Sequence, residues 1–368
     1  MARLEDVCSI NMGQSPESSS YNETGEGIPF FQGNADFGEL HPTVRVWCNA
    51  PTKIAKQGDI LISVRAPIGA LNIANVKCCI GRGLAALSVN ERLCYQKYLW
   101  YALECKVDEL NSKGTGSTFK AINKKTLAET EISLPLLDEQ RRIAAVLDKV
   151  SDLIAKRRAQ LDKLDLLVKA RFVEMFGDEQ KRMLISDVCK IITDGTHQPP
   201  PFVSEGIPFL FVSNIVTNAI TYDTEKYITQ DTYDELIKRT PIEIGDILLS
   251  TVGSYGHPAI VKDNRKFLFQ RHIAYLKPKA EVVYSEYLYS ALLSDDVQKQ
   301  IEGKVKGVAQ KTLNLSEIRT ISIPIPSRDK QKTFCHNLEK IGKRKLTIQQ
   351  SLDKLEVLKK ALMQEYFG

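Results

Sequence analysis

The sequence has no long apolar run, and its opening residues, MARLEDVCSI, do not place a basic stretch before an apolar one. A helix needs about 20 consecutive apolar residues to cross a bilayer, and a secretory signal needs the basic-then-apolar pattern. Both absences argue against a membrane or secreted protein. We therefore expect a soluble protein of the cytoplasm that makes no contact with a membrane.

Metal-ligand spacing is also missing. The chain has eight cysteines and five histidines, but no two cysteines follow C-x-x-C spacing and the histidines do not cluster. Closely spaced Cys and His residues are the usual signature of a zinc site. Most of the cysteines lie in apolar runs, which is typical of buried, reduced thiols in a cytosolic protein. We expect no metal site.

The sequence lacks the signatures of nucleotide-dependent and methyl-transferring enzymes. GKVKGVAQKT at residues 303–312 spaces glycine and lysine wrongly for a phosphate-binding loop, and GTG at residues 114–116 is too short for a cofactor loop. PPPF at residues 199–202 lacks the Asn, Asp or Ser that would accept a hydrogen bond from an amino group being methylated. No acid pair or nucleophile–base pair stands out. We predict that the chain is not an enzyme and has neither catalytic residues nor a cofactor of its own.

What the sequence does contain is the composition of an ordinary globular protein. Its 368 residues are 43% hydrophobic and 26% charged, enough for two domains with real cores. The net charge of +5, from 50 basic and 45 acidic residues, permits binding to nucleic acid but does not require it.

The chain is one unit written twice. Four pairs of segments recur in the same order: LEDVCSI (4–10) and ISDVCKI (185–191), EGIPFF (26–31) and EGIPFL (205–210), QGDILIS (57–63) and IGDILLS (244–250), and YLWYAL (98–103) and YLYSAL (287–292). The segments between these anchors share little. A period of about 190 residues indicates a duplicated domain and not a solenoid. We therefore expect a shared frame that carries divergent connecting segments.

Each copy ends in a long amphipathic stretch, residues 139–177 and 330–368. Apolar side chains recur there at alternating steps of four and three, which places them on one narrow stripe of a helix, as in the seam of a coiled coil. The predicted seam consists of Ile143, Leu147, Val150, Ile154, Leu161, Leu164 and Val168 in the first helix, and Phe334, Leu338, Ile341, Ile348, Leu352, Leu355 and Leu362 in the second. Periodicity alone fits two ordinary core helices equally well, and the duplication favours the coiled coil.

Some seam positions are polar, such as Arg157 on the first helix and Lys345 and Lys359 on the second. Such residues can fix the register of a helix pair or meet acidic groups on a partner. Alternatively, they only extend to solvent.

Both globular halves have the pattern of mixed α and β structure. The GDIL stretches at residues 58–61 and 245–248 begin with a Gly-Asp turn and continue as apolar runs rich in β-branched residues, which is typical of strands. Short helices are expected at residues 95–104, 285–294 and 294–304. The chain therefore belongs to the α+β class.

Alternating apolar residues at 129–136 and 319–326 predict a last strand before each long helix, with Asp138 and Asp329 as helix N-caps. Gly177 fits a helix stop, because glycine adopts the left-handed conformation at low cost. These signals divide the chain into a first globular domain (1–138), a central helix (139–179), a second globular domain (180–329) and a C-terminal helix (330–368).

Polar, glycine-bearing loops occur at matched places in the two halves. Gln, Arg, Ser, Thr, His and Lys are the side chains that bind base edges and phosphates, and glycine allows a backbone to approach a phosphate closely. Any one of these loops could be only a solvated turn, but the matched set favours DNA binding. The candidate residues are Gln14, Ser15, Arg65, Arg82, Ser117 and Lys120 in the first half, and Thr196, His197, Ser254, Tyr255, Arg271, Lys304, Lys306, Gln310 and Lys311 in the second.

At this point the sequence resembles a known family, the specificity (S) subunits of Type I restriction-modification systems. The resemblance rests on ITDGTHQPP (192–200), GDILLSTVGSYG (245–256), GSTFKAINKKTL (116–127) and ISLPLLDEQRRIAAVLD (132–148), and on the duplicated plan of a globular half followed by a long helix. It covers essentially the whole chain.

The resemblance implies two tandem target-recognition domains, each of which reads one half of a bipartite, asymmetric site on double-stranded DNA. The two long helices, conserved regions 1 and 2 of the family, would form an antiparallel coiled coil as a spacer, with a pseudo-two-fold internal repeat. Two methylation (M) subunits would dock on it and methylate adenine, and restriction (R) subunits would join them. S-adenosylmethionine, ATP and magnesium would be bound by those partners and not by this chain.

Two alternatives remain open from the residues. One is a coiled-coil adaptor that never touches DNA. The other is the recognition module of a fused restriction-methyltransferase, against which the complete duplication and the lack of a methyltransferase motif both argue.

Overall fold

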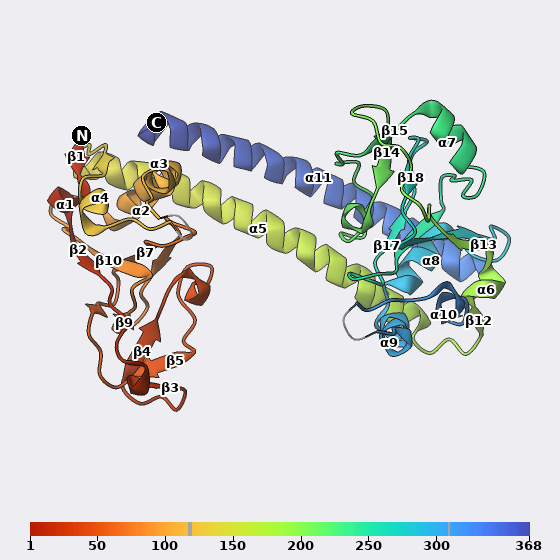
Figure 1. Cartoon of the computed structure of the whole chain (residues 1–368), viewed down its shortest axis with the longest axis horizontal. Coiled ribbons are helices and arrows are strands. Elements are labelled where there is room, and N and C mark those ends of the chain that lie inside the picture. The colour runs from red at the N-terminus through yellow and green to blue at the C-terminus, as the bar shows by residue number, and fades with distance from the viewer. Residues whose placement is uncertain (117–119, 308–309) are drawn as a thin grey trace. The chain divides into compact units, whose positions relative to one another are not determined.

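The computed structural model describes residues 1–116, 120–307 and 310–368 and divides the chain into two compact units. The first unit comprises Met1–Arg158 and Gln350–Gly368, and the second comprises Ala159–Gln349 (Figure 1). Each unit therefore contains one globular half together with portions of both long helices. Because each helix belongs to two units, this division differs from the four sequence segments, which stay predictions.

The first globular half alternates short strands and helices. Its elements are β1 (Ala2–Arg3), α1 (Leu4–Val7), β2 (Cys8–Met12), η1 (Ser18–Ser20), β3 (Tyr21–Asn22), β4 (Ile28–Phe31), η2 (Asn34–Asp36), β5 (Val46–Cys48), β6 (Ile54–Ala55), β7 (Ile60–Ser63), β8 (Leu71–Ile73), β9 (Cys78–Ile80), β10 (Leu84–Val89), α2 (Gln96–Cys105), α3 (Val107–Ser112), α4 (Lys124–Ala128) and β11 (Glu131–Ile132). Strand β1 pairs with β11, so the start of the half meets its end.

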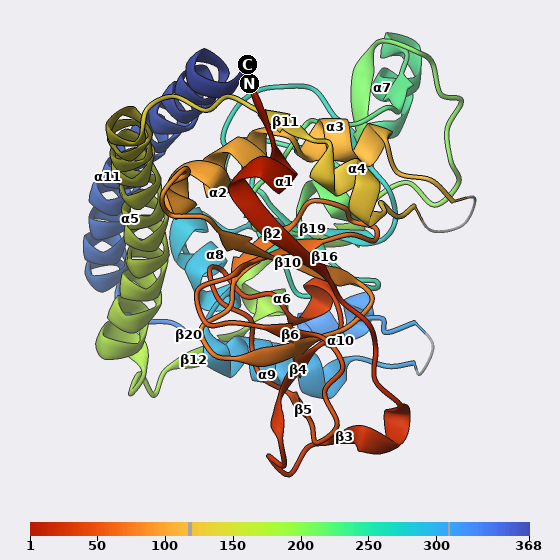
Figure 2. The same ribbon diagram turned by 90° about the vertical axis from the view of Figure 1, so that its left-hand side faces the viewer.

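Two larger sheets form the body of this half. One has the antiparallel order β2-β10-β7-β8, and the other has the order β3-β5-β4-β9-β6, in which β4 and β9 run parallel. The predicted GDIL strand is β7, whose four residues are all buried because both faces of this strand are covered. Figure 2 shows α2 beside the first turns of α5, where Lys97 Nζ lies 2.5 Å from Asp148 Oδ2.

The second globular half repeats this plan. Its elements are β12 (Arg182–Leu184), α6 (Ile185–Val188), β13 (Cys189–Asp194), β14 (Ile207–Leu210), η3 (Val212–Asn214), β15 (Tyr227–Ile228), α7 (Gln230–Leu236), β16 (Ile247–Ser250), β17 (Pro258–Ile260), β18 (Leu268–Phe269), β19 (Ile273–Pro278), α8 (Ser285–Leu292), α9 (Asp295–Lys304), α10 (Leu315–Arg319) and β20 (Ser322–Pro324). The predicted short helices correspond to α2, α8 and α9.

The topology of the second half matches that of the first in the frame and differs in the segments between. The sheet β13-β19-β16-β17 has the same order and directions as β2-β10-β7-β8, and β12-β20 matches β1-β11. The third sheet has the order β15-β14-β18, where the first half has five strands, and α7 occurs in the second half. The mixed α+β class and the internal repeat predicted from the sequence are confirmed at this level.

The two long helices are α5 (Leu137–Phe176) and α11 (Arg328–Phe367), each of 40 residues. The predicted caps are wrong: Asp138 and Asp329 lie inside the first turn, where a carboxylate favours the positive end of the helix dipole. At the start of α11 Ser327 Oγ instead accepts a hydrogen bond from the backbone N–H of Lys330 at 3.5 Å. Ser327, which lies outside the apolar pattern, therefore caps α11 in place of Asp329.

The first long helix stops before Gly177, as predicted, but for a different reason. Gly177 is not among the residues with positive φ, and its N–H donates to the carbonyl of Val173 at 2.7 Å. A Cβ at this position would lie 2.7 Å from the same carbonyl oxygen. Close approach of the backbone, and not a left-handed conformation, therefore accounts for the glycine.

Within each unit the two helices lie side by side and run in opposite directions. In the first unit Arg158 Nη2 lies 2.7 Å from Glu356 Oε1, and in the second Lys345 Nζ lies 2.6 Å from Asp165 Oδ1. All predicted seam residues are buried or half-buried. The polar seam residues are paired inside the chain: Lys345 with Asp165, Lys359 with Glu104 on α2 at 2.8 Å, and Arg157 with Ser351 at 3.2 Å.

The C-terminal end of each long helix is packed into a globular half. Phe176 at the end of α5 is 2% exposed, and its ring lies 5.1 Å from Tyr287 and 5.4 Å from Phe334 in the second unit. At the end of α11, the ring of Phe367 lies 5.1 Å from Tyr98 in the core of the first unit. Residues 350–368 thus complete a hydrophobic core whose other members come from the first 158 residues.

A buried glutamine joins the start of each long helix to its globular half. Gln140 is 0% exposed; its Oε1 accepts from the N–H of Tyr95 at 2.8 Å, and its Nε2 donates to the carbonyls of Leu93 and Pro135. Gln331, also 0% exposed, makes the same three contacts, with Tyr284, Val282 and Pro326. Because the polar atoms of the amide have hydrogen-bond partners that offset their loss of water, this clamp fixes the helix start without leaving a buried polar atom of the amide unsatisfied.

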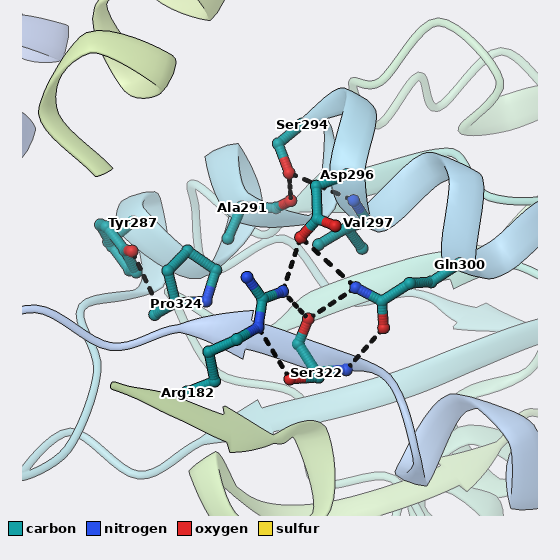
Figure 3. A network of polar contacts seen from close by, with 9 residues as sticks. All are labelled: Arg182, Tyr287, Ala291, Ser294, Asp296, Val297, Gln300, Ser322 and Pro324. Carbon is teal, nitrogen blue, oxygen red and sulfur yellow. Dashed lines mark hydrogen bonds and ion pairs between the residues drawn. The ribbon is translucent and has the colours of Figure 1, made fainter. Parts of the chain in front are cut away.

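A polar network holds the entry to the second half (Figure 3). Arg182 donates to Asp296 Oδ2 at 2.5 Å and to the carbonyl of Ser322 at 2.7 Å. Gln300 accepts from the Ser322 N–H at 2.9 Å and donates to its carbonyl at 2.9 Å. The segment that follows α5 is thereby tied to β20 and α9. In the described part of the chain, no helix is long and apolar enough to cross a membrane.

Candidate nucleic-acid interface

The candidate loops of the first half leave the four-stranded sheet at one edge. Strand β2 ends where β10 begins, with Met12 opposite Ala85, and β7 ends there too, with Ser63 opposite Leu84. Because β10 runs antiparallel to both β2 and β7, the ends of β2 and β7 and the start of β10 lie at the same edge of the sheet. Residues 13–16, 64–69 and 81–83 follow or precede these strands and therefore lie next to one another.

Hydrogen bonds donated by backbone N–H groups join these loops into one surface. The N–H of Arg82 donates to Ser15 Oγ at 3.3 Å, and the N–H of Val64 donates to the carbonyl of Gly83 at 2.9 Å. The N–H of Ala66 donates to the carbonyl of Lys120 at 3.1 Å, and this bond joins a fourth segment, residues 120–121, to the loops. We call the surface formed by residues 13–16, 64–69, 81–83 and 120–121 the first loop cluster.

Most predicted residues of the first half are exposed in this cluster. Gln14, Arg65, Arg82 and Lys120 are exposed and Ser15 is half-buried. Within residues 1–116 and 120–307 and 310–368, none of the three cations has a carboxylate at ion-pair distance. Their charge is therefore available to an anionic ligand. The predicted Ser117 lies outside the described residues.

The second half assembles a matching surface, in which the bonds of Thr251 and Gly253 are equivalent to those of Val64 and Ala66 in the first half. The N–H of Arg271 donates to the carbonyl of Thr196 at 3.0 Å, and the N–H of Thr251 donates to the carbonyl of His272 at 3.0 Å. The N–H of Gly253 donates to the carbonyl of Lys311 at 3.0 Å. The second loop cluster consists of residues 194–198, 251–256, 270–272 and 310–312.

The first strand of the second half carries an irregularity that shifts the repeat register. The pairing of β13 with β19 skips a residue between Cys189 and Ile191. After this bulge Gly195 takes the place of Gly13: their N–H groups donate to Ile273 and Leu84 at equivalent positions. Thr196 therefore corresponds to Gln14, and Asp194 to Met12.

The two equivalent glycines permit close contact between neighbouring loops. A Cβ on Gly13 would lie 2.2 Å from the carbonyl oxygen of Gly81, and a Cβ on Gly195 would lie 2.2 Å from that of Phe269. No side chain fits at either position. Glycine is thus required for the assembly of the clusters, and not necessarily for approach to a phosphate.

The predicted residues of the second half divide into two groups. His197, Ser254, Arg271, Gln310 and Lys311 are exposed, while Thr196 and Tyr255 are half-buried. The ammonium of Lys311 lies 5.9 Å from the centre of the Tyr255 ring, within reach of a cation–π interaction. Burial and the charge of Arg271 both lower the pKa of His272, which keeps that imidazole neutral beside the arginine.

Lys304 and Lys306 are engaged by the protein itself. Lys304 Nζ donates to Thr320 Oγ1 at 2.9 Å, and Lys306 Nζ lies 2.7 Å from Glu317 Oε1. The hydrogen bond from Lys306 lowers the pKa of the Glu317 carboxyl. These two lysines are consequently poorer candidates for DNA contact than Lys311.

The sequence did not single out Arg239 and Asp194, which meet at the second cluster. Arg239 donates to Asp194 Oδ1 and lies 3.2 Å from His197 Nε2. Arg239 belongs to a segment that shares little sequence with the first half, so the repeat gave no signal for it. Across the described residues no group of three His, Cys, Asp or Glu side chains could hold a metal ion.

The family model for the Type I restriction modification DNA specificity domain matches residues 1–164 and again residues 178–359. A putative MjaX specificity subunit from Methanocaldococcus jannaschii is 45% identical over 44% of this chain and 38% of its own length. The EcoBI specificity subunit from Escherichia coli is 21% identical over 92% of this chain and 78% of its own.

Two solved structures are also similar. The HsdS subunit from Thermoanaerobacter tengcongensis is 53% identical over 43% of this chain and 39% of its own, with a TM-score of 0.40. The S subunit from M. genitalium is 16% identical over 100% of this chain and 95% of its own, with a TM-score of 0.55, and shares the fold. The two family matches cover both halves, and the chain belongs to the specificity-subunit family of Type I restriction-modification systems.

Proposed function

We propose that this chain reads a bipartite, asymmetric DNA site, one half-site through each loop cluster. The observation that carries the proposal is that both units build a matching four-segment cluster, in which two backbone hydrogen bonds between loops are equivalent, and that each cluster bears exposed cations. Cations near phosphates supply affinity, and polar side chains in the grooves supply sequence discrimination. The chain itself would be non-catalytic.

The difference between the halves supports an asymmetric site. The frame strands are equivalent, but the segments between β4 and β7 and between β14 and β16 differ in length and in structure. Corresponding positions also differ: Gln14 and Met12 in the first half are Thr196 and Asp194 in the second. Two clusters on one frame with different side chains would bind two different half-sequences.

The long helices are proposed to act as the spacer and as the docking surface for two methylation subunits. Their outward side chains include exposed apolar residues: Val146, Leu153 and Val357 in the first unit, and Leu166, Leu167, Val173 and Leu346 in the second. Large apolar side chains that stay exposed along these helices would lose contact with water if another protein covered them, which supports the docking proposal. The partners would supply S-adenosylmethionine, ATP and magnesium, and restriction subunits would join the complex of DNA and methylation subunits.

Charge predicts how the isolated chain should behave. With a net charge of +5 spread over 368 residues, it has little excess charge to bind DNA by itself. We expect weak binding that falls steeply with salt, and tight, sequence-specific binding only in complex with the methylation subunit. Equally tight and specific binding with and without that subunit would refute this.

Charge reversal at the clusters tests the proposal. Lys120→Glu and Lys311→Glu should each weaken DNA binding by the complex with the methylation subunit and reduce the slope of log affinity against log salt by about 1 or more. Matched controls are Lys77→Glu and Lys262→Glu, which make the same charge change at exposed positions outside the clusters. Assembly of the complex is followed by size-exclusion chromatography.

The outcomes separate the competing functions. Loss of DNA binding with intact assembly in the cluster variants alone supports DNA reading and excludes an adaptor that never touches DNA. Unchanged DNA binding in both cluster variants would refute the proposal. Sequencing of the methylated bases in cells that carry the chain and its methylation subunit then gives the motif, which should be bipartite and asymmetric.

A further inference from the structure

An ion pair at the second loop cluster has no equivalent among the described residues of the first. The carboxylate of Asp194, whose side chain is 17% exposed, accepts a hydrogen bond from Arg239 and lies 2.9 Å from His197 Nε2. The side chains of Arg239 and His197 are both 51% exposed. One nearly buried acid therefore holds two exposed, polar side chains at the edge of the sheet where the cluster lies.

The backbone that carries Arg239 is itself fixed. The residue lies in a turn after α7, in which the N–H of Arg239 donates to Leu236 at 3.3 Å and that of Thr240 to Ile237 at 3.0 Å. Thr240 is 3% exposed. The next carbonyl, of Pro241, accepts from the hydroxyl of Tyr275 in β19 at 2.7 Å. The arginine is thus held at its backbone by the sheet and at its guanidinium by Asp194.

The charge of this ion pair indicates which kind of ligand Arg239 is suited to bind. A guanidinium beside a carboxylate carries no net charge as a pair, so it attracts a phosphate much less than the unpaired Arg65, Arg82 or Lys120 would. The guanidinium is a planar group with five N–H donors, so N–H groups that do not bind Asp194 or His197 can still donate to a ligand. An arginine that is held in place and whose charge is balanced by a carboxylate is suited to a directional contact with a base edge. Bidentate donation to O6 and N7 of guanine is the commonest such contact.

We propose that Arg239 reads a guanine in the half-site bound by the second unit, and that Asp194 is a positioning residue that orients the guanidinium. This inference rests on the proposed function and deepens it. The first unit has Met12 where the second has Asp194, and its described residues contain no helix corresponding to α7. The contact therefore makes the two half-sites different.

The pair could instead only fasten the turn after α7 to β13. Ion pairs at exposed positions contribute little to stability, and the turn is already held by the buried Thr240 and by the Tyr275 hydrogen bond. A merely structural role would not change which base is preferred at one position of the DNA site. Base preference is therefore the measurement that separates the two roles.

The test uses the full chain in complex with its methylation subunit. The variants are Arg239→Ala, Arg239→Gln and Asp194→Asn, with Arg265→Ala as the control. Arg265 is an exposed arginine of the same unit that stacks on Tyr222 at 4.2 Å beyond β17, away from the cluster edge. Binding is measured against the wild-type methylation motif and against every single base-pair change of it, and methylated bases are sequenced in cells.

Both Arg239 variants should lose about tenfold or more of their discrimination at one G·C pair of one half-site, and keep it at all other positions. Asp194→Asn should cause a smaller loss at the same pair, and Arg265→Ala should cause none. An unchanged motif, or an equal loss of affinity for all sequences, would overturn the proposal. If Arg239→Ala lowers the thermal midpoint, the result for Arg239→Gln decides, because glutamine keeps the three side-chain carbons next to the backbone and a polar end.

The wild type serves as the test of the underlying function. Wild-type complex that methylates no bipartite motif refutes the proposed function. Wild-type complex that methylates such a motif, together with Arg239 variants that methylate it unchanged, refutes only the role of Arg239.

Discussion

Phe367→Ala should destabilise the first unit and leave the second unit unchanged, although residue 367 lies close to the end of the chain. The ring of Phe367 lies 5.1 Å from that of Tyr98 and packs against the core of the first unit. Truncation removes this aromatic contact and leaves a space that the surrounding side chains fill only partly.

The size of the effect follows from the burial of the ring. Truncating a fully buried phenylalanine to alanine costs about 3–5 kcal/mol. Phe367 is only partly buried, so we expect a loss of about 2 kcal/mol. For a unit of about 180 residues, this corresponds to a decrease of about 4–8 °C in its thermal midpoint.

The chain contains its own probe for this measurement. Its two tryptophans, Trp47 and Trp100, both lie in the first unit. Trp100 packs against the same core as Phe367. Tryptophan fluorescence during thermal or denaturant unfolding therefore follows the first unit alone.

Two further variants make the result decisive. Val357→Ala changes a side chain of the same helix that is 70% exposed, and should shift the transition by less than about 0.5 kcal/mol. Phe176→Ala makes the matched change at the end of α5, inside the core of the second unit, and should lower a calorimetric transition without moving the tryptophan signal. An unchanged fluorescence transition in Phe367→Ala, or equal shifts in both phenylalanine variants, would show that the reasoning is wrong.

Three other predictions follow from the contacts. Gln140→Leu leaves the buried N–H of Tyr95 and two carbonyls without partners, which should cost about 3 kcal/mol in the fluorescence transition; no change would contradict the clamp. Burial raises the pKa of Asp246, so the folded state binds this proton more tightly and the second unit should lose stability as pH rises above about 4; calorimetry on Asp246→Asn should show a smaller pH slope. Deleting residues 155–161 of α5 with residues 348–354 of α11 should shorten the gap between half-sites by about three base pairs and leave both half-sequences unchanged; an altered half-sequence in the methylated motif would refute the spacer.

Local patterns in the sequence predicted the frame of this protein well. The heptad spacing predicted two long helices to within two residues at their starts, because amphipathic periodicity depends only on neighbouring positions. The repeated GDIL segments predicted β7 and β16, because duplication preserves what the shared frame needs. The N-cap assignment failed because Asp138 and Asp329 suit the first turn of a helix as well as they suit its cap.

Contacts between distant segments were not visible in the sequence. Phe172 and Phe176 lie off the seam stripe, and nothing local indicates that the end of α5 enters a globular core. The one-residue bulge after Cys189 shifts the alignment of the first loops and hid the correspondence of Asp194 with Met12. Arg239 meets Asp194 across 45 residues, so only the folded chain brings the pair together.

The packing of residues 350–368 into the first unit also has a consequence for the order of events during synthesis. A ribosome makes the first 158 residues early, yet the core they form lacks Leu362, Met363, Tyr366 and Phe367 until the rest of this sequence has been translated. The second unit, Ala159–Gln349, has all its parts earlier. Although domains generally fold N-terminal first during synthesis, here the half that is translated first would finish folding last, and a chain that stops after the second unit would carry an exposed apolar surface on the first.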